Sequence, residues 1–232
     1  MKRSDLNGYI RYTIDLLEAN AIKLPSFAYW TADDWKKHRG ELDNIKKIML
    51  GWDVSDFGSG DFLRIGAVLF TIRNGSIKDK SLGTPFAEKI IVLRHENEQY
   101  IPMHCHHDKT EDIINRGGGI LAMELYASTP DGGLDKSSAF DIRMDGFTRR
   151  LSAGETIEVP KGCSITLTPG IYHRFWAKKG FGDLVAGEVS SINDDNTDNY
   201  FVDKNPRFSD LVEDEPAVFI LCNEYEKLLA DA

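Results

Sequence analysis

The sequence lacks the features of a secreted, membrane-spanning or nucleic-acid-binding protein. Its 232 residues include three cysteines, Cys105, Cys163 and Cys222, and no C-x-x-C pair, so we expect no disulfide framework and a reducing compartment. No apolar run reaches membrane-spanning length, and the amino terminus shows no signal-peptide pattern. The net charge of −9 disfavours nucleic acid and anionic membranes as partners. These absences predict a cytoplasmic protein.

Helical patterns are confined to the first part of the chain. Apolar residues at three- and four-residue steps predict an amphipathic helix over residues 4–21, with Ser4 as its N-cap. Thr31, with Asp34 three residues later, predicts the start of a second, short helix. We expect residues 1–60 to form a helical extension that packs on the remaining domain or joins a dimer contact.

From residue 61 to residue 232 the pattern changes to short strands. Short apolar runs alternate with Gly, Pro, Asn and Asp, and Asn74-Gly75 is a strong tight-turn pair. Many short strands without intervening helices favour a sandwich or closed barrel over an α/β sheet. The predicted strands are residues 65–73, 87–94, 100–106, 111–115, 120–127, 140–144, 156–159, 164–167, 172–177 and 184–191.

The stretch from residue 100 to residue 119 has the spacing of a metal site. Because a strand has a period of two, His104 and His106 are expected on one face, with Cys105 on the other. A short turn can return Glu111 beside them on an adjoining strand. Two imidazoles and a carboxylate form an open site for a divalent first-row metal, whereas His107 is expected to point away from it.

A second stretch, residues 154–173, offers a fourth ligand. It is broken by turn residues and ends at His173, which follows the Pro169-Gly170 turn. A lone histidine is more often a core or surface group than a ligand, since imidazole has many uses. If the two stretches lie on facing strands of a barrel, His173 completes a set with the two histidines and the carboxylate.

Together the two stretches resemble the two cupin motifs, H-x-H-x4-E and G-x5-P-x-G followed by a distant His. Over nearly the whole chain, the sequence resembles the D-lyxose isomerase family of cupin-type sugar isomerases. Its most specific strings are EKIIVLRHENEQYIPMHCHHDKTEDIINRGGG, GEVSSINDDNTDN and EDEPAVFILCNEY. The resemblance implies a mainly β fold: a cupin β-barrel, or double-stranded β-helix (jelly roll), with an N-terminal helical addition.

The resemblance also implies a reaction, a cofactor and an assembly. A metal-dependent aldose–ketose isomerase of this family interconverts D-lyxose and D-xylulose, with D-mannose and D-fructose as further substrates. Metal-assisted proton transfer through a cis-enediol is expected, and a hydride shift is the other route open to such a site. The family favours Mn²⁺, while a mixed nitrogen and oxygen ligand set also suits Zn²⁺, Co²⁺, Fe²⁺ or Ni²⁺. The expected partner is a small-molecule sugar, and the expected assembly is a homodimer.

Several charged residues are candidates for proton transfer. Lys109 lies between the second histidine and Glu111, and although such a turn lysine is usually solvated, the resemblance favours a catalytic role. Glu213 and Glu215 belong to an acidic run of the kind that usually forms a solvated face; the resemblance implies that one of them, preferably Glu215, faces the metal. Glu188 in an apolar strand is a third carboxylate candidate, and Lys89 is a candidate contact for sugar hydroxyls.

Two other functions remain open from the residues alone. An Fe²⁺-dependent cupin dioxygenase would use the same ligand types but would consume O₂. A sugar- or metal-binding cupin without turnover would keep the ligands and need no proton-transfer group.

Overall fold

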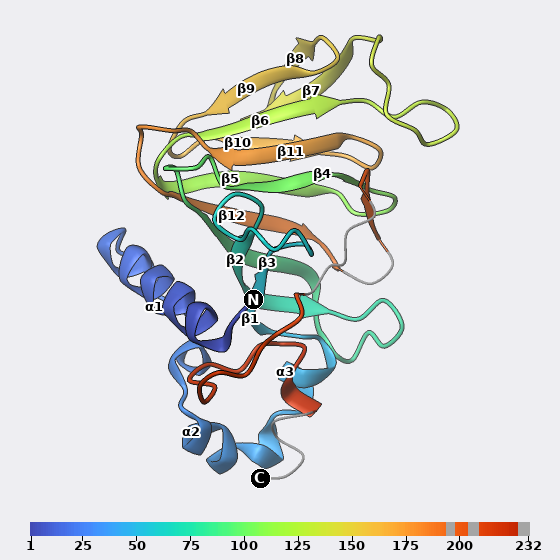
Figure 1. Cartoon of the computed structure of the whole chain (residues 1–232). Helices are drawn as coiled ribbons and strands as arrows, with labels where there is room; N and C mark the ends of the chain where they lie inside the picture. Colours follow the sequence, from blue (N-terminus) through green and yellow to red (C-terminus); the bar gives the residue numbers. More distant parts are fainter. Residues whose placement is uncertain (194–197, 204–208, 227–232) are drawn as a thin grey trace.

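Two antiparallel β-sheets make up most of the protein, which a computed structural model describes over residues 1–193, 198–203 and 209–226. The larger sheet contains, in spatial order, β1 (Gly51–Ser55), β2 (Ala67–Gly75), β3 (Gly83–Leu93), β12 (Leu184–Ser191), β5 (Glu111–Gly118), β10 (Ser164–Leu167), β7 (Phe140–Met144) and β8 (Phe147–Leu151). The smaller sheet contains β13 (Asn199–Phe201), β4 (Tyr100–His106), β11 (Tyr172–Ala177), β6 (Leu121–Tyr126) and β9 (Glu155–Val159). Strands that are far apart in sequence are neighbours in the larger sheet, as β12 beside β5 shows (Figure 1).

The main hydrophobic core fills the space between the sheets. Ile113 of β5 and Ile165 of β10 are cross-strand partners in the larger sheet, and Met123 of β6 pairs with Phe175 of β11 in the smaller sheet. All four side chains belong to one buried cluster. Because alternate residues of each strand face inward, the same inner faces can also carry polar side chains toward the barrel interior.

A helical layer covers the β2–β3 end of the larger sheet. It contains α1 (Arg3–Ala19), α2 (Ala32–Lys37) and α3 (Asp43–Lys47), with 3₁₀ turns at Ser26–Tyr29 and Arg39–Glu41. Apolar side chains of α1 share a second buried cluster with the outer face of β2 and β3. The chain's last described segment, residues 209–226, lies beside α1 (Figure 1), where Arg3 binds the carboxylates of Glu213 and Glu224.

Most of the predicted strands are confirmed, whereas three strands of the structure were not predicted. β1, β8 and β13 are short and lie at sheet edges. In β8 only the last residue, Leu151, is buried, so its sequence shows no inward-facing apolar pattern. The predicted division at residue 60 stays a prediction; the helical part ends before β1, whose residues already pair with β2.

Two local predictions about turns and caps are wrong. Asn74 and Gly75 do not form a tight turn but end β2, and the side chain of Asn74 is buried against Asn193. Ser4 lies inside α1, where its hydroxyl donates to Asp214, and the N-cap is Lys2. The predicted capping box of Thr31 and Asp34 is confirmed at the start of α2. In the described residues, no helix combines the length and apolar character needed to span a membrane.

Candidate metal centre and its catalytic surroundings

A β-bulge in β4 directs two histidines into the barrel. His104 pairs with His173 of β11, whereas the next pairing is Ile101 with Phe175, so β4 has one extra residue over this interval. The bulge allows Ile101 to join the core while His104 and His106 also face inward. As predicted from the strand period, Cys105 lies on the opposite face, where its thiol interacts with Tyr172.

His173 and Glu111 meet this pair from two other strands. The ring centroids of His104 and His173 are 4.1 Å apart. The three histidines offer ligand atoms that all lie within 4.8 Å of one another. Glu111, the first residue of β5, approaches from the facing sheet. Its Oε1 is 3.3 Å from His106 Nε2 and 3.2 Å from His173 Nε2. The structure therefore brings together all four residues that the sequence motifs single out.

Hydrogen bonds orient the histidines toward one point. His104 Nδ1 lies 2.8 Å from the carbonyl oxygen of Pro102, and His173 Nδ1 lies 3.1 Å from that of Ile171. Nδ1–H donation to these carbonyls leaves each Nε2 with a lone pair, a common arrangement of metal-binding histidines. His106 Nε2, His173 Nε2 and Glu111 Oε1 are buried, and although they lie close to one another, none has a hydrogen bond of regular geometry within the described residues. Since buried polar atoms are rarely left unsatisfied, this group fits a divalent metal ion.

Electrostatics favours the protonation states that metal ligands need. Burial, followed by the neighbouring His173 and His106, lowers the pKa of His104 well below its usual value. Burial alone raises the pKa of Glu111, but the nearby Lys109 and His106 outweigh it, so the pKa is held well below its usual range. These shifts favour the neutral imidazole of His104 and the ionised carboxylate of Glu111, the forms in which each binds a metal.

A buried network of charged groups adjoins the ligand set. Lys109 Nζ lies 2.8 Å from Glu111 Oε2 and 3.0 Å from Glu188 Oε1, and its side chain is only 3% exposed. Glu188 on β12 pairs with Lys89 on β3, whose Nζ is 3.7 Å from the same oxygen. Ser190 Oγ also donates to Glu188 Oε1. Strands β3, β12 and β5 carry Lys89, Glu188 and Glu111, and the turn before β5 adds Lys109, so two ammonium groups and two carboxylates lie in one buried network with the histidines.

Glu213 and Glu215 lie elsewhere, which corrects the expectation that one of them faces the metal. Both oxygens of Glu213 accept hydrogen bonds from Arg3, and Glu215 accepts one from Asn7. Arg3 and Asn7 belong to α1, and the Glu213 side chain is 43% exposed. The acidic run therefore fastens the chain's last described segment to α1, whereas Glu188 is the carboxylate that the structure brings to the site.

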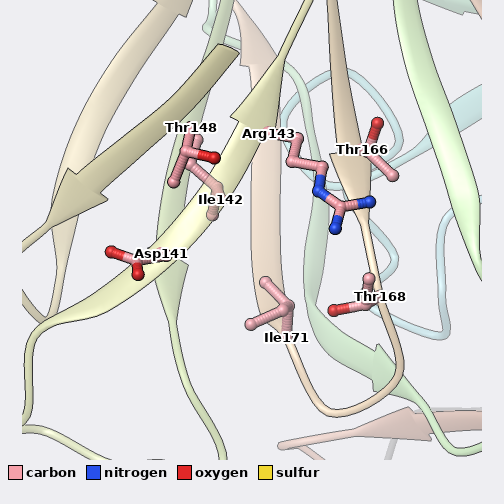
Figure 2. Close-up of a pocket in the computed structure, with 7 residues that line it drawn as sticks. All are labelled: Asp141, Ile142, Arg143, Thr148, Thr166, Thr168 and Ile171. Atoms are coloured by element: carbon pink, nitrogen blue, oxygen red, sulfur yellow. The ribbon is translucent and has the colours of Figure 1, made fainter. Parts of the chain in front are cut away.

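Two cavities in the described part of the chain have linings that do not include the histidines. One, of about 320 Å³, is lined by Asp141, Ile142, Arg143, Thr148, Thr166, Thr168 and Ile171. Figure 2 shows Arg143 beside Thr166 and Thr168, with Asp141 turned away. The other, of about 300 Å³, is lined by Ile77, Pro85, Asp108, Lys109, Ser191, Ile192 and Asp198. The second cavity shares Lys109 with the charged network and has a volume typical of small-molecule sites.

Comparisons with known proteins agree with this geometry. The family model for D-lyxose isomerase matches residues 1–225. A D-lyxose/D-mannose isomerase of Serratia proteamaculans is 42% identical over 231 residues, covering 99% of this chain and 100% of that protein. Its counterpart from Escherichia coli O157:H7 is 41% identical, covering 98% and 99%.

A solved structure confirms the fold. The L-ribose isomerase of Acinetobacter sp. DL28, determined with L-ribose, superposes with a TM-score of 0.55 at 16% identity, covering 88% of this chain and 93% of that one. At this identity the likeness concerns the fold, and the predicted mainly β, cupin-type barrel is confirmed.

Proposed function

The chain belongs to the D-lyxose isomerase family and is an aldose–ketose isomerase, and from this premise we propose that it interconverts D-lyxose with D-xylulose and D-mannose with D-fructose. The observation that carries the proposal is the buried group of three histidines and Glu111, with Lys109 and Glu188 on the same inner surface. Family membership favours this reaction over an Fe²⁺ dioxygenase or a binding module without turnover.

In this proposal His104, His106, Glu111 and His173 hold one divalent ion. When bound, the ion supplies a Lewis acid that stabilises negative charge developing on the sugar oxygens. The two carbonyl groups that orient His104 and His173 support this role, as do the buried ring nitrogens that have no hydrogen bond of regular geometry within the described residues. The family resemblance favours Mn²⁺, and Zn²⁺, Co²⁺, Fe²⁺ and Ni²⁺ also suit these ligands.

We assign proton transfer to Glu188 and Lys109. The carboxylate of Glu188 takes the proton from C2 of the aldose, the C–H electrons form the C1=C2 bond, and the C1=O electrons move to O1, which is protonated to give a cis-enediol. As O2–H loses its proton and its electrons form the C2=O bond, the C1=C2 electrons take the proton from Glu188 onto C1, and the proton lost by O2 balances the one gained by O1. The ammonium of Lys109 lies between Glu188 and Glu111, and when the sugar binds, one of its protein acceptors is exchanged for the sugar oxygen that gains charge. Lys89, which contacts Glu188 on the far side, adds positive charge to the pocket.

Two further proposals concern the oligomeric state and the cellular location of the protein. We propose that the functional unit is a homodimer, which light scattering on the purified protein tests directly. We also propose a cytoplasmic location, supported by three free cysteines in the described residues and by the acidic net charge.

The test is an isomerisation assay on D-lyxose, D-mannose and L-ribose. Protein stripped with a chelator is compared with samples reloaded separately with Mn²⁺, Zn²⁺, Co²⁺, Fe²⁺ and Ni²⁺. We expect the stripped protein to be inactive and at least one ion to restore turnover of D-lyxose without O₂ consumption. Absence of D-lyxose turnover with every ion refutes the proposed substrate, and O₂ uptake with Fe²⁺ supports the dioxygenase instead.

A further inference from the structure

The ammonium group of Lys109 has a neutral hydrogen-bond partner as well as its two carboxylates. Besides Glu111 and Glu188, it donates to Oδ1 of Asn193 at 3.1 Å. An ammonium carries three hydrogens on a flexible four-carbon stem, so its direction is set by the acceptors around it. These three oxygens come from separate parts of the chain: Glu111 begins β5, Glu188 lies on β12, and Asn193 follows β12.

Asn193 is itself fixed by a second asparagine. Its backbone N–H donates to Oδ1 of Asn74 at 3.0 Å, and Nδ2 of Asn74 donates to the carbonyl of Asn193 at 3.0 Å. Both residues are buried. Asn74 is part of β2, two strands away from β12, so the reciprocal pair ties Asn193 to the rigid sheet and holds its side-chain oxygen in place.

The backbone of Lys109 is fixed independently by Asp198. The carboxylate of Asp198 accepts the N–H groups of three consecutive residues, His107 and Asp108 at 2.9 Å and Lys109 at 3.1 Å. The neighbouring residue, Asn199, pairs with His106 in the β13–β4 ladder. Asp198 thus fixes the turn from which the Lys109 side chain starts, between the ligands His106 and Glu111.

From these contacts we propose that Asn193 and Asp198 are positioning residues that hold Lys109 at its two ends, Asn193 at the ammonium and Asp198 at the backbone. The inference rests on the proposed function, since it concerns how Lys109 meets the sugar. Without Asn193, the ammonium loses its neutral acceptor, and the two carboxylates alone set the direction in which it faces the substrate. Neither residue contacts the histidine ring nitrogens in the described part of the chain, so metal binding is preserved.

The test compares Asn193→Leu, which keeps the volume and removes the acceptor, with Asn193→Asp, which keeps an oxygen at the same position. Loss of a hydrogen bond to a charged group predicts that Asn193→Leu lowers kcat by about 10- to 100-fold. We expect the KM for D-lyxose to stay within about twofold and the metal content to equal that of the wild type. Asn193→Asp is expected to retain kcat within about threefold, and Asn44→Leu, at an exposed helix position, serves as the matched control.

Other outcomes overturn the proposal. Full kcat in Asn193→Leu excludes the positioning role, and equal losses of kcat and metal in both Asn193 variants indicate a purely structural one. If Asn193→Leu does not fold, Asn193→Ala, which leaves space instead of an apolar group, is measured against the same expectations.

A second readout separates this inference from the proposed function. In Zn²⁺-loaded protein labelled with ¹³C at the lysine Cε, the Lys109 signal is assigned by its loss in Lys109→Met. We expect one sharp signal in the wild type and in Asn193→Asp, and a broadened or split signal in Asn193→Leu. An unchanged signal in Asn193→Leu overturns the proposal even if the wild type isomerises D-lyxose. Conversely, the wild type could show no turnover while the three proteins give the expected spectra. That result refutes the proposed isomerase function but keeps the positioning of Lys109 by Asn193.

Discussion

Replacing Glu188 with glutamine tests the proposed base most directly. The substitution keeps the size of the side chain and removes its charge and its ability to accept a proton. General acid–base catalysis typically contributes about 10²- to 10⁴-fold, so we expect kcat to fall by that factor. The metal content should be unchanged, because Glu188 contacts Lys109, Lys89 and Ser190.

The geometry also gives the expected cost in stability. Glu188 Oε1 lies 3.0 Å from Lys109 Nζ, and at an effective dielectric constant of about 20 two unit charges at that distance attract by about 5 kcal/mol before desolvation. Removing one partner of a buried pair usually destabilises a protein by about 3–5 kcal/mol. Glutamine still accepts a hydrogen bond, so we expect about 3 kcal/mol. For a chain of this length, that lowers the Tm by roughly 6–12 °C.

The matched control is Glu215→Gln. Glu215 is the carboxylate that the sequence analysis favoured as the one facing the metal. Glu215 accepts a hydrogen bond from Asn7 of α1, so the Glu215→Gln variant should keep kcat within about twofold of the wild type. Steady-state assays on D-lyxose, metal analysis and thermal unfolding are run on both variants. The reasoning is refuted if Glu188→Gln keeps full kcat with its metal, or if Glu215→Gln alone abolishes turnover while keeping the fold and the metal.

Three further predictions concern the ligands, the α1 contact and pH. His104→Ala should lose the metal and the activity together, whereas His107→Ala, at an exposed position, should keep both; elemental analysis and assays decide. Arg3→Met removes a fully buried guanidinium between two carboxylates and should cost about 3–5 kcal/mol in urea unfolding, and an unchanged midpoint contradicts the contact. Asp34 has its pKa lowered to about 2 because it accepts hydrogen bonds from the hydroxyl and N–H of Thr31. Its contribution is therefore present above its usual pKa near 4 and is lost as the pH falls toward 2, so the stability difference between the wild type and Asp34→Asn should narrow over that range.

The four clustered residues that we propose as metal ligands could be selected from the sequence because their geometry is mostly local. His104 and His106 lie on one strand, where a period of two places them on the same face, and a short turn separates them from Glu111. The bulge that brings Ile101 to the same side has no clear signal in the sequence, yet it lies before the two histidines and leaves their spacing intact. His173 needed the additional assumption that the second stretch faces the first, which the cupin motifs supplied.

The proton-transfer groups could not be chosen in this way. Glu188 and Glu215 are both carboxylates in short segments, and their local sequences do not say which one reaches the barrel interior. That choice depends on β12 inserting between β3 and β5, a pairing between strands about 70 to 100 residues apart in the chain. It depends equally on Arg3 and Asn7, which hold the acidic run against α1. The contacts of Lys109 with Asn193 and Asp198 likewise could not be predicted from the sequence, because they join segments that are distant in the chain.

By itself, the sequence determined the strand-rich architecture, the family and the four residues proposed as ligands, because strand period, turn composition and motif spacing act over a few residues. Only the tertiary structure decided which carboxylate joins the lysine beside those ligands. Strand order and helix docking are set by packing and hydrogen bonds between segments distant in the chain, and these contacts leave no periodic pattern along it.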